Sequence, residues 1–211
     1  MKKLFQVAAL VVSTLALSGC LSLKSYVDPA LGELPAAERV QVAKAQPVQF
    51  IFEFKTKGAP NARATKLLSE QATDIVRKSG LFSEVSSEPV QNGALLSVSV
   101  DNIPQEGAAS KGFATGLTLG LAGSLVDDYY EGSARYSPGA NGAVISVRNK
   151  HAIHSMIGAG SAPANMVQSK NLDEAARTML RQLMDRMLND LAKDPGFAKA
   201  STNDPANEKI G

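Results

Sequence analysis

The chain has few of the residues that usually cross-link a fold or carry out chemistry. Its 211 residues include one cysteine, two histidines and no tryptophan, and aromatic residues make up only 5% of the sequence. A single cysteine excludes an intrachain disulfide, so a largely aliphatic core must stabilise the protein. The sequence has no phosphate-binding loop, dinucleotide fingerprint or Gly-x-Ser-x-Gly elbow. It therefore predicts no cofactor, no catalytic residue and a non-enzymatic protein.

Charge of one sign is not in excess either. The chain has 22 basic and 20 acidic residues, and two of the lysines lie within residues 1–19. Without that segment the net charge is close to zero. Because nucleic-acid binding requires a clustered basic surface, and the sequence has no basic arm, we expect no nucleic-acid partner.

The N-terminus, in contrast, has the layout of an export signal. A positive start, Met1-Lys2-Lys3, precedes an apolar run over residues 4–17, and the small residues Ser18 and Gly19 lead to Cys20. This is the order of a signal peptide. The apolar run is shorter than the roughly 20 residues that a membrane-spanning helix needs. Residues 1–19 are thus predicted to be a cleaved signal peptide.

The last four residues of this signal, Leu17-Ser18-Gly19-Cys20, resemble the lipobox of bacterial lipoproteins. The resemblance implies cleavage before Cys20, lipidation of its thiol and acylation, as with palmitate, of the new amino terminus. In that family an Asp after the Cys favours the inner membrane. Here the residue is Leu21, which implies the periplasmic face of the outer membrane. The alternative is an ordinary secretory signal, which would leave an unpaired thiol in an oxidising compartment.

Beyond the signal, hydrophobic periodicity predicts alternating strands and helices. Residues 20–46, broken by prolines and a glycine, are interpreted as a lipidated tether with one possible helical turn near 36–43. Period-two patterns predict strands at 47–55, 82–89, 93–104, 129–136 and 143–157. Helical patterns predict helices at about 62–79, capped by Asn61, and from 171 to 194. Residues 195–211 are interpreted as a flexible tail.

This order, β-α-β-β-insert-β-β-α, predicts one α+β domain over residues 47–194. One apolar face on each helix and on most strands favours a mainly antiparallel sheet of about five strands with two helices on one face. The order of elements resembles the α/β domains of small envelope lipoproteins, among them the curli secretion lipoprotein and the Pel polysaccharide lipoprotein.

A glycine-rich, apolar insert, residues 107–127, separates the third and fourth predicted strands. Its uncharged part, 112–126, has a small residue at every fourth position, which on a helix gives a smooth face suited to close packing. The same stretch also alternates as a strand would. Two readings therefore stay open: packing on its own domain, or contact with a membrane or a second subunit. For the second reading the candidate residues are Gly112, Gly116, Leu117, Gly120, Leu121 and Ser124.

The remaining polar candidates are two histidines and two acids. His151 and His154 are predicted to lie on opposite faces of a strand at the protein surface, without further ligands for a metal site. Asp127 and Asp128 are interpreted as solvated loop acids. Of Tyr129 and Tyr130, one is expected in the core.

Three functions are compatible with these features. The leading hypothesis is a non-enzymatic envelope lipoprotein that binds a partner or self-assembles through residues 112–126. The second is a ligand-binding accessory lipoprotein that hands a lipid or glycan to a transport system. The third is a hydrolase, which would require a close Ser/His or Asp/His geometry around His151 or His154.

Overall fold

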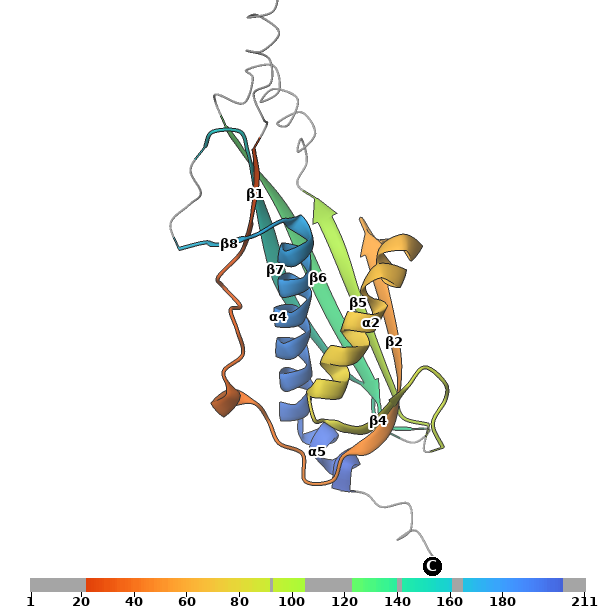
Figure 1. The fold of residues 1–211 in the computed structure, drawn as a ribbon. Coiled ribbons are helices and arrows are strands. Elements are labelled where there is room, and N and C mark those ends of the chain that lie inside the picture. Colours follow the sequence, from red (N-terminus) through yellow and green to blue (C-terminus); the bar gives the residue numbers. More distant parts are fainter. Residues whose placement is uncertain (1–21, 92, 105–122, 140–141, 161–164, 203–211) are drawn as a thin grey trace, which may run out of the picture.

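The computed structural model describes residues 22–91, 93–104, 123–139, 142–160 and 165–202 (Figure 1). The lipobox with Cys20 and the insert residues Gly112, Gly116, Leu117, Gly120 and Leu121 lie outside the described residues. The described chain forms an eight-stranded sheet with the order β3-β2-β5-β6-β7-β1-β8, and β4 pairs with β2. The strands are β1 (Leu23–Val27), β2 (Gln46–Thr56), β3 (Ala59–Pro60), β4 (Phe82–Ser86), β5 (Leu95–Pro104), β6 (Ser124–Ser137), β7 (Ile145–Ile157) and β8 (Val167–Ser169).

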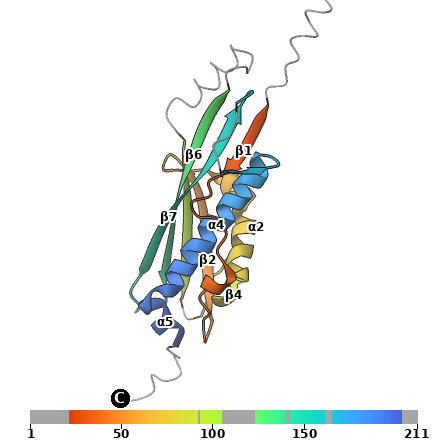
Figure 2. The same ribbon diagram turned by 90° about the vertical axis from the view of Figure 1, so that its left-hand side faces the viewer.

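The helices lie on one face of this sheet, as the sequence predicts. The two long helices are α2 (Ala62–Lys78) and α4 (Leu172–Lys193), and α4 is followed by a short helix, α5 (Pro195–Thr202). Figure 2 shows α2 and α4 together on one side of the strands, and the other side is called the outer face below. The Asn61 side chain accepts a hydrogen bond of 3.0 Å from the Ala64 amide, which confirms it as the N-cap of α2.

The core lies between the sheet and these two helices. Alternate residues of β2 and β5 are buried on the helix-covered face, as their period-two pattern predicts. The buried set comprises Val48, Phe50, Phe52, Phe54, Leu96, Val98 and Val100. From α4, Leu180, Leu183 and Leu191 are fully buried against them. The core is largely aliphatic, as expected from the composition.

The sheet is mixed rather than mainly antiparallel around β2. Strand β2 runs parallel to both β4 and β5. The reason is the connection through α2, because a chain that leaves a strand, crosses in a helix and returns to the same sheet comes back parallel. From β5 to β8 each neighbouring pair is antiparallel, as predicted.

The prediction of a tether over residues 20–46 is wrong, because the segment begins with a strand of the sheet and the chain that follows packs on the domain. Residues Leu23–Val27 form β1, which pairs with β7 on one side and β8 on the other. Tyr26 and Val27 are each only 5% exposed. A five-residue strand with two adjacent polar residues, Lys24 and Ser25, is too short to stand out by periodicity. The expected helical turn is present as the 3-10 helix η1, Ala36–Glu38.

The chain between β1 and β2 follows α4 (Figure 1) and is held there by polar contacts. Arg39 forms an ion pair of 2.9 Å with Asp185, and the Val40 amide donates to the Asn189 side chain at 2.9 Å. Leu34 is buried, with 6% of its surface exposed. We call residues 28–45 the strap. It packs on the domain, where the sequence predicts a free linker.

The tail prediction is also wrong for its first part. Residues 195–202 form α5, and Phe197 is 1% exposed between the rings of Phe82 and Tyr136. Proline is well tolerated at the first position of a helix, and Pro195 begins α5. The carboxylate of Asp194 accepts from the Gly196 amide at 2.7 Å and caps this turn.

Candidate functional site

One end of the sheet carries the entry of the chain into the fold. Leu23, the first residue of β1, is the register partner of Ile157, the last residue of β7. Ile157 is in turn the partner of Ser124, the first residue of β6. Cys20 precedes Leu23 by three residues in the sequence, a length of chain that spans at most about 10 Å. We call this end of the sheet the anchor end.

The insert joins the sheet at the same end. Strand β5 finishes at Pro104, the partner of Asp128, and β6 begins at Ser124. The last residues of the predicted insert, 124–127, are therefore strand. Ser124, one of the proposed contact residues, lies in the sheet opposite Ile157. Like residues stand side by side in Leu125-Val126 and Asp127-Asp128, so no period-two pattern marks this part of β6 in the sequence.

Asp127 and His154 lie next to each other on the outer face of the anchor end, and this corrects their predicted positions. His154 is 8% exposed, and its Nδ1 lies 2.7 Å from a carboxylate oxygen of Asp127 on the neighbouring strand. Its Nε2 faces Asp28, which follows β1, at 3.4 Å. The histidine is thus bracketed by two carboxylates. Asp127 is no solvated loop acid, because the strand register places it directly opposite His154.

This arrangement contains the Asp/His geometry that the hydrolase hypothesis requires, but with both ring nitrogens directed at carboxylates. An imidazole activates a nucleophile through a ring nitrogen that can accept its proton. With Asp127 on one nitrogen and Asp28 on the other, the cluster instead links β6, β7 and the chain after β1. The cluster therefore holds two strands and the chain after β1 together on the outer face of the anchor end.

The neighbouring acid, Asp128, projects toward the helix-covered face. Burial raises the pKa of Asp128, the nearby charge of Asp127 adds to this, and a hydrogen bond with Asn102 opposes it. The adjacent Tyr130 is 8% exposed and packs edge-on against Phe54, whereas Tyr129 is 45% exposed. The prediction that one of the two tyrosines lies in the core is confirmed.

His151 lies on the opposite face of β7 from His154, as predicted, but it is buried under α4 rather than exposed. Its Nε2 is 2.8 Å from the Gln182 side-chain oxygen, and its Nδ1 accepts from the Ala152 amide at 3.0 Å. This pattern fits a neutral ring with the proton on Nε2. Burial lowers the pKa of His151, and the hydrogen bond to Gln182 opposes the shift.

The same contacts continue to the surface through the strap. The amide nitrogen of Gln182 donates to Glu33 at 2.9 Å, and Glu33 pairs with both guanidinium nitrogens of Arg181. The hydrogen bonds from Arg181 are the main cause that lowers the pKa of Glu33 to about 2. This polar chain ties the strap, α4 and β7 together. Its members are distant in the sequence, so no local pattern predicts it.

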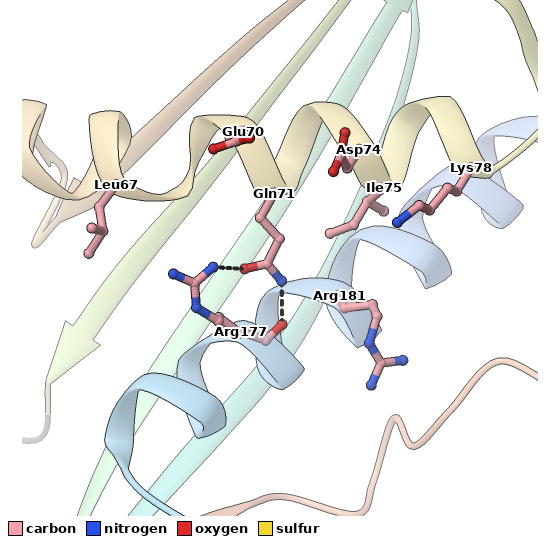
Figure 3. A pocket seen from close by; sticks show the side chains of 8 residues that line it. All are labelled: Leu67, Glu70, Gln71, Asp74, Ile75, Lys78, Arg177 and Arg181. Atoms are coloured by element: carbon pink, nitrogen blue, oxygen red, sulfur yellow. Dashed lines mark hydrogen bonds between the residues drawn. The ribbon is translucent and has the colours of Figure 1, made fainter.

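A groove of about 320 Å³ runs between the exposed sides of α2 and α4 (Figure 3). Gln71 of α2 reaches across it, donating to the Arg177 carbonyl at 2.7 Å and accepting from the Arg177 side chain at 3.4 Å. In Figure 3 the Arg181 side chain is directed away from Gln71. Gln71 and Arg177 already satisfy each other's polar groups, so the groove is a helix-helix seam.

A larger groove of about 760 Å³ lies on the outer face and curls around β2 to the start of α2. Serine hydroxyls from β5 and β6 line it, and the hydroxyl oxygens of Ser99 and Ser133 are 2.9 Å apart. The charged residues that line it are Glu53, Lys55, Lys66, Arg135 and Arg148. Four of these five are cations, and the sequence analysis did not single out any of them.

Among the described residues, no group of three or more His, Cys, Asp or Glu side chains is placed to hold one metal ion. No helix in the same part of the chain is both long and apolar enough to cross a bilayer.

Several solved structures are similar to this chain, among them two structures of one protein. No family model matches the chain, and no curated protein matches it. The two structures are crystal forms of the PelC dodecamer from Paraburkholderia phytofirmans, one of them a single-residue variant. The variant is 14% identical, with a TM-score of 0.39, and the other 15% identical, with a TM-score of 0.38. In both cases the match covers 81% of this chain and 96% of the other.

Proposed function

We propose that this chain is a lipid-anchored, non-enzymatic component of a bacterial envelope, facing the periplasm, which binds a partner or assembles with its own kind. One observation carries the proposal. The chain enters the sheet at Leu23, directly after the lipobox, and the ends of the apolar insert, Pro104 and Ser124, lie at that same end of the sheet. An acylated Cys20 and the insert would then face the same membrane.

The short link makes this arrangement specific. A tether of 27 residues would let the domain point in any direction, whereas the three residues from Cys20 to Leu23 limit the separation to about 10 Å. Two or more acyl chains provide stable anchoring where a single chain gives marginal binding. The domain would therefore be held close to the lipid surface with its anchor end toward it. The outer membrane is the location implied by Leu21.

Lipidation is tested by the mass of the protein extracted from membranes of an expressing bacterium. We expect the wild-type chain to begin at Cys20 and to carry diacylglycerol and a further acyl chain, and to sediment with outer-membrane fractions. Cys20→Ser is expected to leave an unacylated protein with its signal attached or cleaved elsewhere. A wild-type protein that is soluble, with a free thiol at Cys20, would contradict the proposal.

The assembly role of the insert is tested by light scattering of the detergent-extracted protein. Gly116→Leu and Gly120→Leu would fill the smooth face that the insert offers a partner. A native mass above that of the monomer, lost in these variants but kept in Ser146→Leu, supports assembly through the insert. Ser146 is an exposed residue near the other end of the sheet. A monomer in every case would remove self-assembly and leave a different partner as the target.

A second candidate function is a ligand-binding accessory lipoprotein. The observation that favours it is the outer-face groove, which is large enough for a small molecule and is lined by polar side chains from five elements. Such a role is compatible with the anchor, since an anchored domain can hold a soluble ligand close to a membrane. Recovery of a small molecule from the native, membrane-extracted protein would favour this role over assembly.

A further inference from the structure

The outer-face groove has an ordered floor and a strong charge bias. In register across the sheet, Ile51, Ser97 and Arg135 form one row, and Glu53, Ser99, Ser133 and Arg148 form the next. Three serines thus lie in the centre, on β5 and β6. Two arginines lie on the side of β6 and β7, and two lysines, Lys55 and Lys66, lie on the side of β2 and α2.

The two arginines are not used inside the fold. Both are exposed, and no hydrogen bond or ion pair joins Arg135 or Arg148 to another residue in the part of the chain that the structure describes. By contrast, the next cation along β7, Lys150, forms an ion pair of 2.7 Å with Glu131. Lys55 is paired with Glu53, the one acid in the groove, at 3.1 Å. A surplus of unpaired positive charge therefore remains at the groove.

This geometry matches a ligand with more than one oxyanion. Neighbouring strands are about 4.8 Å apart, so the cations on β2 and on β7 lie roughly 14 Å from each other across the sheet. A guanidinium offers a planar pair of donors that fits a carboxylate or phosphate. Between the cations, the serine hydroxyls can both donate to and accept from uncharged hydroxyl groups.

We propose that the groove binds an acidic oligosaccharide, with carboxylate groups on at least two of its sugars held by Arg135, Arg148 and the opposing lysines, and its hydroxyls resting on the serine floor. The inference rests on the proposed function, since it names the ligand of an anchored binding component. Sugar hydroxyls complement the serine floor, whereas an acidic peptide would place backbone groups and apolar stems there.

The anchor membrane itself is not the source of these anions. Arg135 lies eleven positions along β6 from Ser124 at the anchor end. At about 3.3 Å per residue this is roughly 36 Å along the strand. Charged headgroups are screened beyond about 8 Å at physiological ionic strength. The ligand must therefore reach the groove from solution.

The test is calorimetric titration of the full detergent-extracted chain with a galacturonate tetramer, at low salt. The same tetramer with methyl-esterified carboxylates is the matched neutral ligand. We expect the acidic tetramer to bind, to weaken as salt rises, and to bind at least tenfold more tightly than the ester. In R135Q/R148Q the affinity should fall at least tenfold, and in Lys66→Gln about threefold. In the control Lys150→Gln it should change less than twofold.

Several results would overturn the proposal. The first is that the tetramer does not bind at all, or that the ester binds equally well. Another is that the affinity is unchanged in a double variant whose circular dichroism is native. The others are that a glutamate peptide binds more tightly, or that the two arginines recruit the protein to phosphatidylglycerol vesicles. Lys66→Gln keeps the test valid should the double variant not fold. Loss of tetramer binding with intact acylation at Cys20 leaves the anchor standing. Binding by a chain that is never acylated removes the anchor and keeps the groove.

Discussion

Among single residues, the buried polar groups explain most of what sets this fold apart from a plain aliphatic core. His151 and His154 are three residues apart on β7 and face opposite sides of the sheet, yet both are buried. One is satisfied by Gln182 from α4, the other by Asp127 and Asp28. Buried polar groups need partners because an unsatisfied one costs about 1–3 kcal/mol. Each histidine therefore fixes the position of a neighbouring element.

The lowered pKa of His151 predicts a loss of stability in mild acid. The unfolded chain takes up a proton near its ordinary pKa of 6.5, whereas the folded protein does so only at lower pH. Since the unfolded state binds more protons in this interval, the free energy of unfolding falls as pH drops below about 6.5, by at most about 1.4 kcal/mol per pH unit. Urea unfolding at pH 7.5 and 5.5 should show a smaller loss in His151→Gln than in the wild type. An equal loss in both proteins would exclude this origin.

Gly132 on β6 sets the approach of α4 to the sheet. An added Cβ would lie 2.8 Å from both the Sδ and the Cε of Met187, and 3.0 Å from a methyl of Leu183. These are flexible side-chain ends that can move aside, so Gly132→Ala should lower the free energy of unfolding by about 1 kcal/mol, the low end of the range for overpacking. Gly132→Val should cost more. Gly58→Ala tests the opposite case, since open space surrounds Gly58 and only its positive φ of 77° opposes a side chain.

At the scale of elements, the long periodic segments were predictable and the short ones were not. Strand β2 and helix α2 have clear periods, an alternating buried face and a capping residue, and the sequence predicts both within two residues. Strands β1, β3 and β8 are two to five residues long, too short to establish a period. Strand β1, for example, pairs with β7, which lies more than 100 residues further along the chain. A local sequence pattern cannot contain such a pairing.

The candidate sites divide in the same way. The predicted lipobox is contiguous in the sequence, whereas the outer-face groove collects residues from β2, α2, β5, β6 and β7. Only the strand register brings Ser97, Ser133 and Arg148 together. The sequence predicts Asp127 in a loop because charged residues after an apolar stretch usually mark one. Here the strand continues through them, and His154 opposite supplies the missing partner.

Substitutions in and just after β1 test whether this segment is folded into the domain or is a free tether. Val27 is 5% exposed and belongs to the core cluster, whereas Ala30, three residues later, is exposed. A buried charge without a partner is strongly destabilising. Val27→Asp should therefore lower the free energy of unfolding by several kcal/mol in denaturant titrations, and Ala30→Asp by less than about 0.5 kcal/mol. If residues 20–46 were a free tether, the two variants would be equally stable.

At the scale of the whole molecule, different features lie at different positions along the strands of the sheet. One end gathers Leu23, Ser124 and Ile157, next to the lipobox in sequence and to the ends of the insert. The outer-face groove lies farther along the sheet, since Ser133 and Arg135, which line it, are nine and eleven positions from Ser124 along β6. An anchored molecule would thus present its anchor end to lipid and its groove to the solution. Anchoring and ligand binding would then occupy separate surfaces.

The most direct test of this account is the distance of the two ends from the membrane. Because the chain has one cysteine, which the lipid would occupy, a cysteine added at Lys24 or at Ser146 is the sole free thiol. Both positions are exposed. A nitroxide is attached to each, and the protein is reconstituted in vesicles that contain a nickel-chelating lipid. The account predicts strong relaxation of the label at position 24 and little at position 146. Equal relaxation at both positions, or none at either, would contradict it.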